Sequence, residues 1–105
     1  MLADEIEVAE LQQQLTTAKT DIQVIDVRRH AEIVRGTIPG ADRLPLQELH
    51  QNLDCVARDK MVVLYCQIGA VSAQACSYLA GKGFDNVYNL RGGIQAWTNS
   101  GLKVA

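Results

Sequence analysis

Cys66 is the residue of this sequence best placed for nucleophilic chemistry. It follows the apolar run 61–65, and a helical pattern begins a few residues later, near Val71. Backbone N–H groups at the start of a helix lack partners and carry partial positive charge, which stabilises a thiolate. We therefore expect the pKa of Cys66 to lie below the value of about 8.5 of a free cysteine. Cys55 and Cys76 lack this placement, and for them we expect the more common role of small buried apolar residues.

A charged set comprising Asp26, Arg28 and Glu32 follows the β-branched segment 22–25. Arg28 and Glu32 are four residues apart, the spacing of an ion pair across one helical turn. Asp26 can accept backbone N–H groups and fix the loop. The alternative is that Arg28 attracts an anion to the site, and we rank the structural role first.

Two glycine-containing segments add possible site elements. The segment 36–41 contains Pro39 and Gly40, and it predicts a rigid turn. The segment Arg91-Gly92-Gly93 precedes a helical pattern, where it can form a tight turn or bind an anion at the helix start. We expect Trp97, in that last helix, to fill core volume.

The two histidines, His30 and His50, are expected to be exposed. Neither is placed to act as a base for Cys66, so the sequence does not support a Cys–His protease. Neither lies at ligand spacing from a cysteine, so we expect no zinc site.

Segments with strand and helix patterns alternate along the chain and must position these residues. Strands are predicted at 6–8, 22–27, 41–44, 61–65 and 87–90, and helices at 8–18, 31–35, 46–56, 71–81 and after 93. This alternation is typical of an α/β domain whose parallel sheet carries helices on both faces. Ligands of such sheets bind beyond the carboxyl ends of the strands, where Asp26, Arg28, Cys66 and Arg91 all fall. In the helix that follows Cys66, the spacing predicts a core-facing row formed by Val71, Ala75, Tyr78 and Leu79.

Size and composition narrow the class of protein. A chain of 105 residues is long enough for one domain, which we expect to span 1–105, and too short for two. The net charge of −2 gives no reason to expect a nucleic-acid or membrane partner. No apolar run reaches the length of a membrane span, and the acidic start of the chain does not resemble a signal peptide. Three cysteines without tight spacing fit a reducing compartment, so we expect a cytoplasmic protein.

Three segments together resemble the signatures of the rhodanese-like family. The first is Asp26-Val27-Arg28 with Glu32, followed by Gly36-Thr37-Ile38-Pro39-Gly40-Ala41 and Pro45. The second is the active-site loop from Tyr65 and Cys66 through Gly69 to Ser72, and the third runs from Leu90 through Gly92-Gly93 to Trp97. The order is that of the family and nearly the whole chain is covered. The resemblance implies a single rhodanese-like domain, a three-layer sandwich with a five-stranded parallel sheet and helices on both faces.

The resemblance also implies a sulfurtransferase or sulfur carrier that works without a cofactor or metal. Cys66 would take a sulfur atom from thiosulfate or a persulfide and pass it to cyanide, a thiol or a sulfur-carrier protein. Arg28 and Arg91 would attract the donor, while Asp26 and Glu32 would be structural residues near the site. The loop amides would hold the anionic sulfur, and they belong to Gln67, Ile68, Gly69, Ala70, Val71 and Ser72.

Two positions depart from the family pattern. Val71 stands where many members carry an arginine, and Thr37 stands where a histidine is frequent. The loop therefore has no cation of its own, and Arg28, Arg35 and Arg91 are the local cations that remain. This departure motivates the alternative of a non-catalytic binding or regulatory module. A related cysteine phosphatase would need an arginine where Ser72 stands and a loop one residue longer, so we rank it last.

Overall fold

Five parallel strands in the order β1-β5-β4-β2-β3 form the sheet of this protein. The computed structural model describes residues 4–18 and 21–105. The strands are β1 Asp4–Ile6, β2 Ile22–Asp26, β3 Asp42–Arg43, β4 Met61–Tyr65 and β5 Val87–Leu90. The helices are α1 Val8–Ala18, α2 His30–Ile33, α3 Leu46–Leu49, α4 Ala70–Gly81 and α5 Gly93–Asn99, with a 3-10 turn η2 at Leu53–Cys55. The predicted five-stranded parallel sheet is therefore confirmed.

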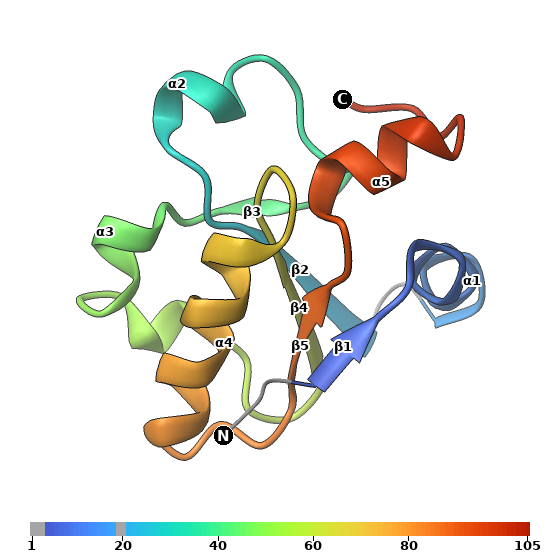
Figure 1. Cartoon of the computed structure of the whole chain (residues 1–105). Helices are drawn as coiled ribbons and strands as arrows, with labels where there is room; N and C mark the ends of the chain where they lie inside the picture. The colour runs from blue at the N-terminus through green and yellow to red at the C-terminus, as the bar shows by residue number, and fades with distance from the viewer. Residues whose placement is uncertain (1–3, 19–20) are drawn as a thin grey trace.

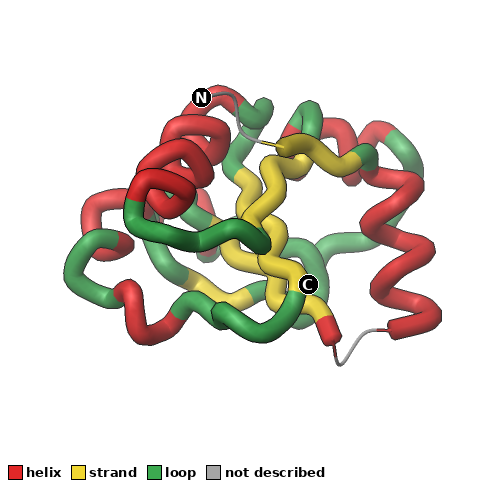
Figure 2. The backbone as a smooth tube through the Cα atoms, turned by 90° about the horizontal axis from the view of Figure 1, so that it is seen from below, coloured by secondary structure: helices red, strands yellow, loops and turns green. Residues whose placement is uncertain are grey.

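The central strand β4 is apolar on both faces because helices cover both sides of the sheet (Figure 1 and Figure 2). Its side chains alternate between two cores: Val62 and Leu64 join one cluster, and Val63 and Tyr65 join the other. Helices α3 and α4 cover the first cluster, and helices α1 and α5 cover the second. Trp97 of α5 is buried in the second cluster, as the sequence predicts.

Two predicted elements differ from those observed. The first strand spans residues 4–6 rather than 6–8, and helix α1 already begins at Val8. The predicted helix 46–56 is divided into α3 and η2. Asn52 has φ −132°, outside the helical region, and its side-chain amide donates to the carbonyl of Glu48. That side-chain bond competes with helix continuation, a known property of asparagine.

The core-facing side of α4 also differs from the predicted row. Ala75 and Leu79 are buried as expected, but the other buried residues of the helix are Ser72 and Cys76. Val71 and Tyr78 are exposed instead. The helix begins at Ala70 and turns its polar Ser72 inward, because that hydroxyl reaches Cys66 and Asn89.

The three cysteines are free, and their burial divides them. Cys76 is buried as predicted, whereas Cys55 is exposed, which corrects the prediction. Cys55 lies at the end of the 3-10 turn, and this segment packs Leu53 and Val56, rather than Cys55, against the core. Within residues 4–18 and 21–105, no helix is long and apolar enough to cross a membrane.

Candidate active site

The carboxyl ends of β2, β4 and β5 meet at one edge of the sheet, as the sequence predicts for the site. Cys66 directly follows β4, and the loop 67–69 leads from it into helix α4. The first turn of α5 is docked on this loop: the amide of Ile94 donates to the carbonyl of Cys66 at 3.0 Å, and that of Gln95 donates to the carbonyl of Gln67 at 3.1 Å. Two segments distant in sequence therefore fix the position of the cysteine.

Gly93 makes that docking possible. Its φ is +61°, and a Cβ placed there would lie 2.4 Å from the carbonyl oxygen of Cys66 and 2.6 Å from that of Gln67. Only glycine fits, because both the backbone conformation and the close approach exclude a side chain.

We expect Gly93→Ala to lower the free energy of unfolding by about 2–4 kcal/mol, combining backbone strain with the displaced loop. Gly101→Ala is the matched control, since Gly101 also has a positive φ, +82°, but a Cβ added there would meet no atom within 4 Å. In this control the free energy of unfolding should fall by about 1 kcal/mol, from backbone strain alone. Urea denaturation of both variants measures the difference, and equal losses would show that the contact with the Cys66 loop is unimportant.

Backbone amides and a hydroxyl surround the sulfur of Cys66. The amide of Gly69 lies 3.1 Å from Sγ, and the amide and hydroxyl of Ser72 each lie 3.3 Å from it. Gly69 is the N-cap of α4 and has φ +102°, a conformation that turns the loop amides around the sulfur. Ser72 therefore adds a donor to the sulfur rather than capping the helix.

Opposing effects act on the thiol of Cys66. Burial raises the pKa, whereas hydrogen bonds from the side chain and amide of Ser72 and from the amides of Gly69 and Ile68 lower it. The donors outweigh burial, and the pKa of Cys66 is lowered from its ordinary value. Burial, aided by the charge of Cys66, raises the pKa of Cys76 to about 12, so Cys76 stays a protonated thiol. Cys66 is thus the buried cysteine suited to act as a nucleophile.

Ser72→Ala should raise the pKa of Cys66 because the thiolate loses a charge-assisted donor. A bond of this kind contributes about 1.5 kcal/mol or more, so alkylation of Cys66 by iodoacetamide at neutral pH should slow about tenfold. The lowered pKa keeps the thiolate populated to lower pH in the wild type, so the pH profile of alkylation should shift upward in the variant. Ser100→Ala, which removes an exposed hydroxyl from the end of α5, should leave the profile unchanged.

Arg28 is bound by Asp26, not by Glu32, which corrects the predicted ion pair. Its guanidinium contacts both carboxylate oxygens of Asp26, with Nη2 at 2.8 Å from Oδ2, and Nη2 also donates to the carbonyl of Gly36 at 2.6 Å. Glu32 instead pairs with Arg29 at 3.4 Å on the surface. Helix α2 begins only at His30, so the helical spacing assumed for Arg28 does not apply.

Asp26 has the predicted loop-fixing role. Its Oδ1 accepts the backbone N–H of Arg28 at 3.0 Å, and its side chain is fully buried. The remaining nitrogen of Arg28, Nη1, lies 3.4 Å from Oε1 of Gln67. Through these contacts the end of β2 is joined to the Cys66 loop.

A cavity of about 440 Å³ opens beside Cys66. Its polar lining comes from the end of β2, α2, α3 and the loop: Arg28, Arg29, Glu32, Gln47 and Gln67. Its apolar lining comes from Val27, Leu46, Ile68, Ala70 and Val71. Of the predicted loop residues, Gln67, Ile68, Ala70 and Val71 therefore line the cavity, while Gly69 and Ser72 contact the sulfur.

The other predicted cations do not line this cavity. Arg91 lies 3.9 Å from Glu5 and 3.6 Å from Glu7, and it is largely exposed. Arg35 is exposed beyond α2.

Thr37 is buried and exchanges two backbone hydrogen bonds with Ala105, so its role is structural.

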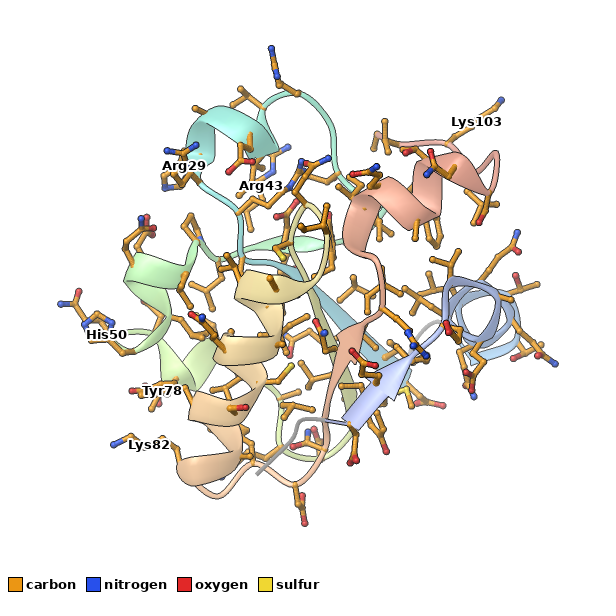
Figure 3. All side chains as sticks on the ribbon, in the orientation of Figure 1. Arg29, Arg43, His50, Tyr78, Lys82 and Lys103 are labelled. Carbon is orange, nitrogen blue, oxygen red and sulfur yellow. The ribbon has the colours of Figure 1, made fainter. Side chains whose placement is uncertain are left out.

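The histidines also lie outside the site. His30 contacts Glu48 at 2.7 Å on the surface, and His50 is exposed beside α3 (Figure 3).

Sequence reasoning missed Asn89 altogether, and for Tyr65, which it placed in the active-site loop, it missed the contact that the side chain makes. Asn89 of β5 is buried; its Oδ1 lies 2.5 Å from the hydroxyl of Ser72, so it competes with the sulfur of Cys66 for the one proton of that hydroxyl, and its Nδ2 donates to the carbonyl of Gly69 at 3.1 Å. Tyr65 is fully buried, and its hydroxyl accepts the amide of Ile38 at 2.9 Å, which fixes the 36–41 turn beside Arg28. A polar residue inside an otherwise apolar strand was the available signal for both.

The chain belongs to the rhodanese-like domain family, whose model matches residues 7–100. A sulfurtransferase of Allochromatium vinosum is 41% identical over 103 residues, which cover 98% of this chain and 95% of that protein. The thiosulfate sulfurtransferase GlpE of Shewanella oneidensis is 37% identical over 84 residues, covering 80% and 82% of the two chains.

Solved structures agree with the family assignment. A rhodanese-like domain protein of Staphylococcus aureus superposes with a TM-score of 0.86 at 31% identity, covering 97% of this chain and 98% of that one. A rhodanese-related protein of Thermoplasma volcanium gives a TM-score of 0.87 at 30% identity, with 97% of each chain covered. The predicted rhodanese-like architecture is therefore confirmed, and sulfur transfer is the general activity of the named relatives.

Proposed function

We propose that this protein carries sulfur as a persulfide on Cys66 and transfers it from thiosulfate or a persulfide donor to a thiol or cyanide. The observation that carries the proposal is that buried Cys66 lines a cavity and that N–H and O–H groups converge on its sulfur. These donors stabilise both the attacking thiolate and the charge of the outer sulfur that follows.

The first half-reaction is an attack on the donor's sulfane sulfur. The thiolate of Cys66 forms a new S–S bond to this atom, and the donor's own S–S bond breaks. The electron pair of the broken bond leaves with sulfite, or with a thiolate when the donor is an organic persulfide. The lowered pKa of Cys66 favours the thiolate that makes this attack.

In the second half-reaction the acceptor attacks the outer sulfur of the Cys66 persulfide. The electron pair of the broken S–S bond returns to Cys66 as a thiolate, which regenerates the protein. The acceptors we propose are small thiols, cyanide and a sulfur-carrier protein, in the reducing cytoplasm and without a cofactor. The loop lacks a cation to clamp a phosphate, so phosphoryl transfer is not supported.

Steady-state turnover tests the proposal. The protein is incubated with thiosulfate and cyanide, and separately with an organic persulfide and a small thiol, while thiocyanate, sulfite and the product persulfide are measured. We expect catalytic turnover in at least one pair. Absence of turnover in every pair, under conditions in which a rhodanese control is active, would favour a non-catalytic binding module.

A further inference from the structure

The charged side chains that line the cavity beside Cys66 indicate which kind of substrate it can bind. The lining cations, Arg28 and Arg29, each have a carboxylate partner, Asp26 and Glu32 respectively. Arg28 is also buried, with a side chain only 5% exposed, so its charge is neutralised before any ligand arrives. Among the described lining residues, each cation already contacts a carboxylate.

The apolar lining of the cavity comes from two parts of the chain. Val27 and Leu46 come from the segments after β2 and at the start of α3, while Ile68 and Val71 come from the Cys66 loop and α4. Ile68 is 62% exposed and Val71 is 42% exposed, although both are large apolar side chains. Exposed apolar surface at the mouth of a cavity is typical of a surface that a ligand covers.

We propose that the sulfur acceptor of this site is a small thiol with an uncharged, apolar arm, which lies along Ile68, Val71 and Leu46. The inference rests on the proposed persulfide function and adds the chemical class of the acceptor. The acceptor thiolate attacks the outer sulfur of the Cys66 persulfide and forms an organic persulfide. The S–S bond to Cys66 breaks, and its electron pair returns to Sγ as a thiolate. No oxidant or reductant is consumed.

A series of straight-chain alkanethiols tests this acceptor class. Ethanethiol, propanethiol, butanethiol and pentanethiol have nearly equal thiol acidity, so their intrinsic reactivity is nearly equal and only the apolar contact changes. Cys66 is first loaded with polysulfide, and loss of the extra sulfur is followed by intact mass. A fully buried methylene would raise the rate constant about fourfold. If half of each methylene is buried, the rate constant should rise about twofold for each methylene added.

Variants at the cavity mouth separate binding from general reactivity. Ile68→Gln and Val71→Gln should each flatten the dependence of the rate constant on chain length. Val34→Gln is the matched control, since Val34 is 75% exposed and does not line the cavity. It should keep the wild-type dependence. The anionic 2-mercaptoethanesulfonate should react more slowly than butanethiol in the wild type.

The outcomes separate the two proposals. If Cys66 cannot be loaded by any donor, the persulfide function fails and the acceptor class fails with it. If Cys66 loads but the rate does not rise with chain length, or the sulfonate reacts faster than butanethiol, the acceptor class is overturned while the persulfide function stands. An unchanged dependence in both Ile68→Gln and Val71→Gln would also overturn it.

Discussion

Replacing Cys66 with serine is expected to abolish sulfur transfer with every donor and acceptor. A serine hydroxyl is not ionised at neutral pH and forms no persulfide, so both half-reactions lose their covalent intermediate. The substitution is nearly isosteric in a buried position, so the fold should be kept. Turnover of the variant is measured with the donor pair that is most active in the wild type.

Cys55→Ser is the matched control for this loss. Cys55 is exposed, lies in a 3-10 turn and does not line the cavity. It should retain wild-type turnover. Retained turnover in Cys66→Ser, or a comparable loss in Cys55→Ser, would contradict the assignment of the nucleophile.

Asp26→Ala is expected to have the largest effect on stability. Arg28 would keep its buried guanidinium but lose the carboxylate that neutralises it, leaving only the carbonyl of Gly36 and the amide oxygen of Gln67. Breaking a buried ion pair from one side costs about 3–5 kcal/mol, which is a large part of the stability of a small domain. Urea denaturation at neutral pH measures this loss.

Glu32→Ala provides the comparison on the same segment of the chain. The Arg29–Glu32 pair is largely solvent-exposed, with side-chain exposures of 74% and 34%, so its removal should cost at most about 1 kcal/mol. A loss of less than about 1 kcal/mol in Asp26→Ala would show that the buried pair is not a major support of the site.

The layout of the fold was predictable because its signals are local. The apolar segment 61–65 indicates a strand covered on both faces, and it is the central β4. The alternation of strand and helix patterns along the chain then requires parallel pairing, which places Asp26 and Cys66 at the same edge. The position of the nucleophile could therefore be predicted from the sequence.

The partner of Arg28 and the break after α3 were not predictable because they depend on the path of the chain. Arg29 has an extended backbone, with ψ 153°, so Arg28 lies before the helix and turns back to Asp26 instead of reaching Glu32. Likewise Asn52 breaks a pattern whose apolar spacing is helical. The spacing of residues along the sequence cannot reveal either feature, since an argument from spacing assumes a regular helix, which these two segments do not form.

The contacts of Ser72 could not be predicted without knowing the register of the strands. Asn89 reaches Ser72 and Gly69 because β5 pairs with β4 so that Asn89 lies beside Leu64, two residues before Cys66. This pairing joins residues that are 17 and 20 positions apart in the sequence. Helical spacing pointed to Val71 as the inward residue, whereas this contact turns Ser72 inward and leaves Val71 at the cavity.

The most direct test of the central claim is the intact mass of the protein after brief treatment with thiosulfate and, separately, with an organic persulfide. We predict an adduct of one sulfur atom that maps to the peptide containing Cys66, disappears on reduction and does not form in Cys66→Ser. An adduct located only on Cys55, or no adduct under conditions that load a rhodanese control, would contradict a persulfide mechanism at Cys66.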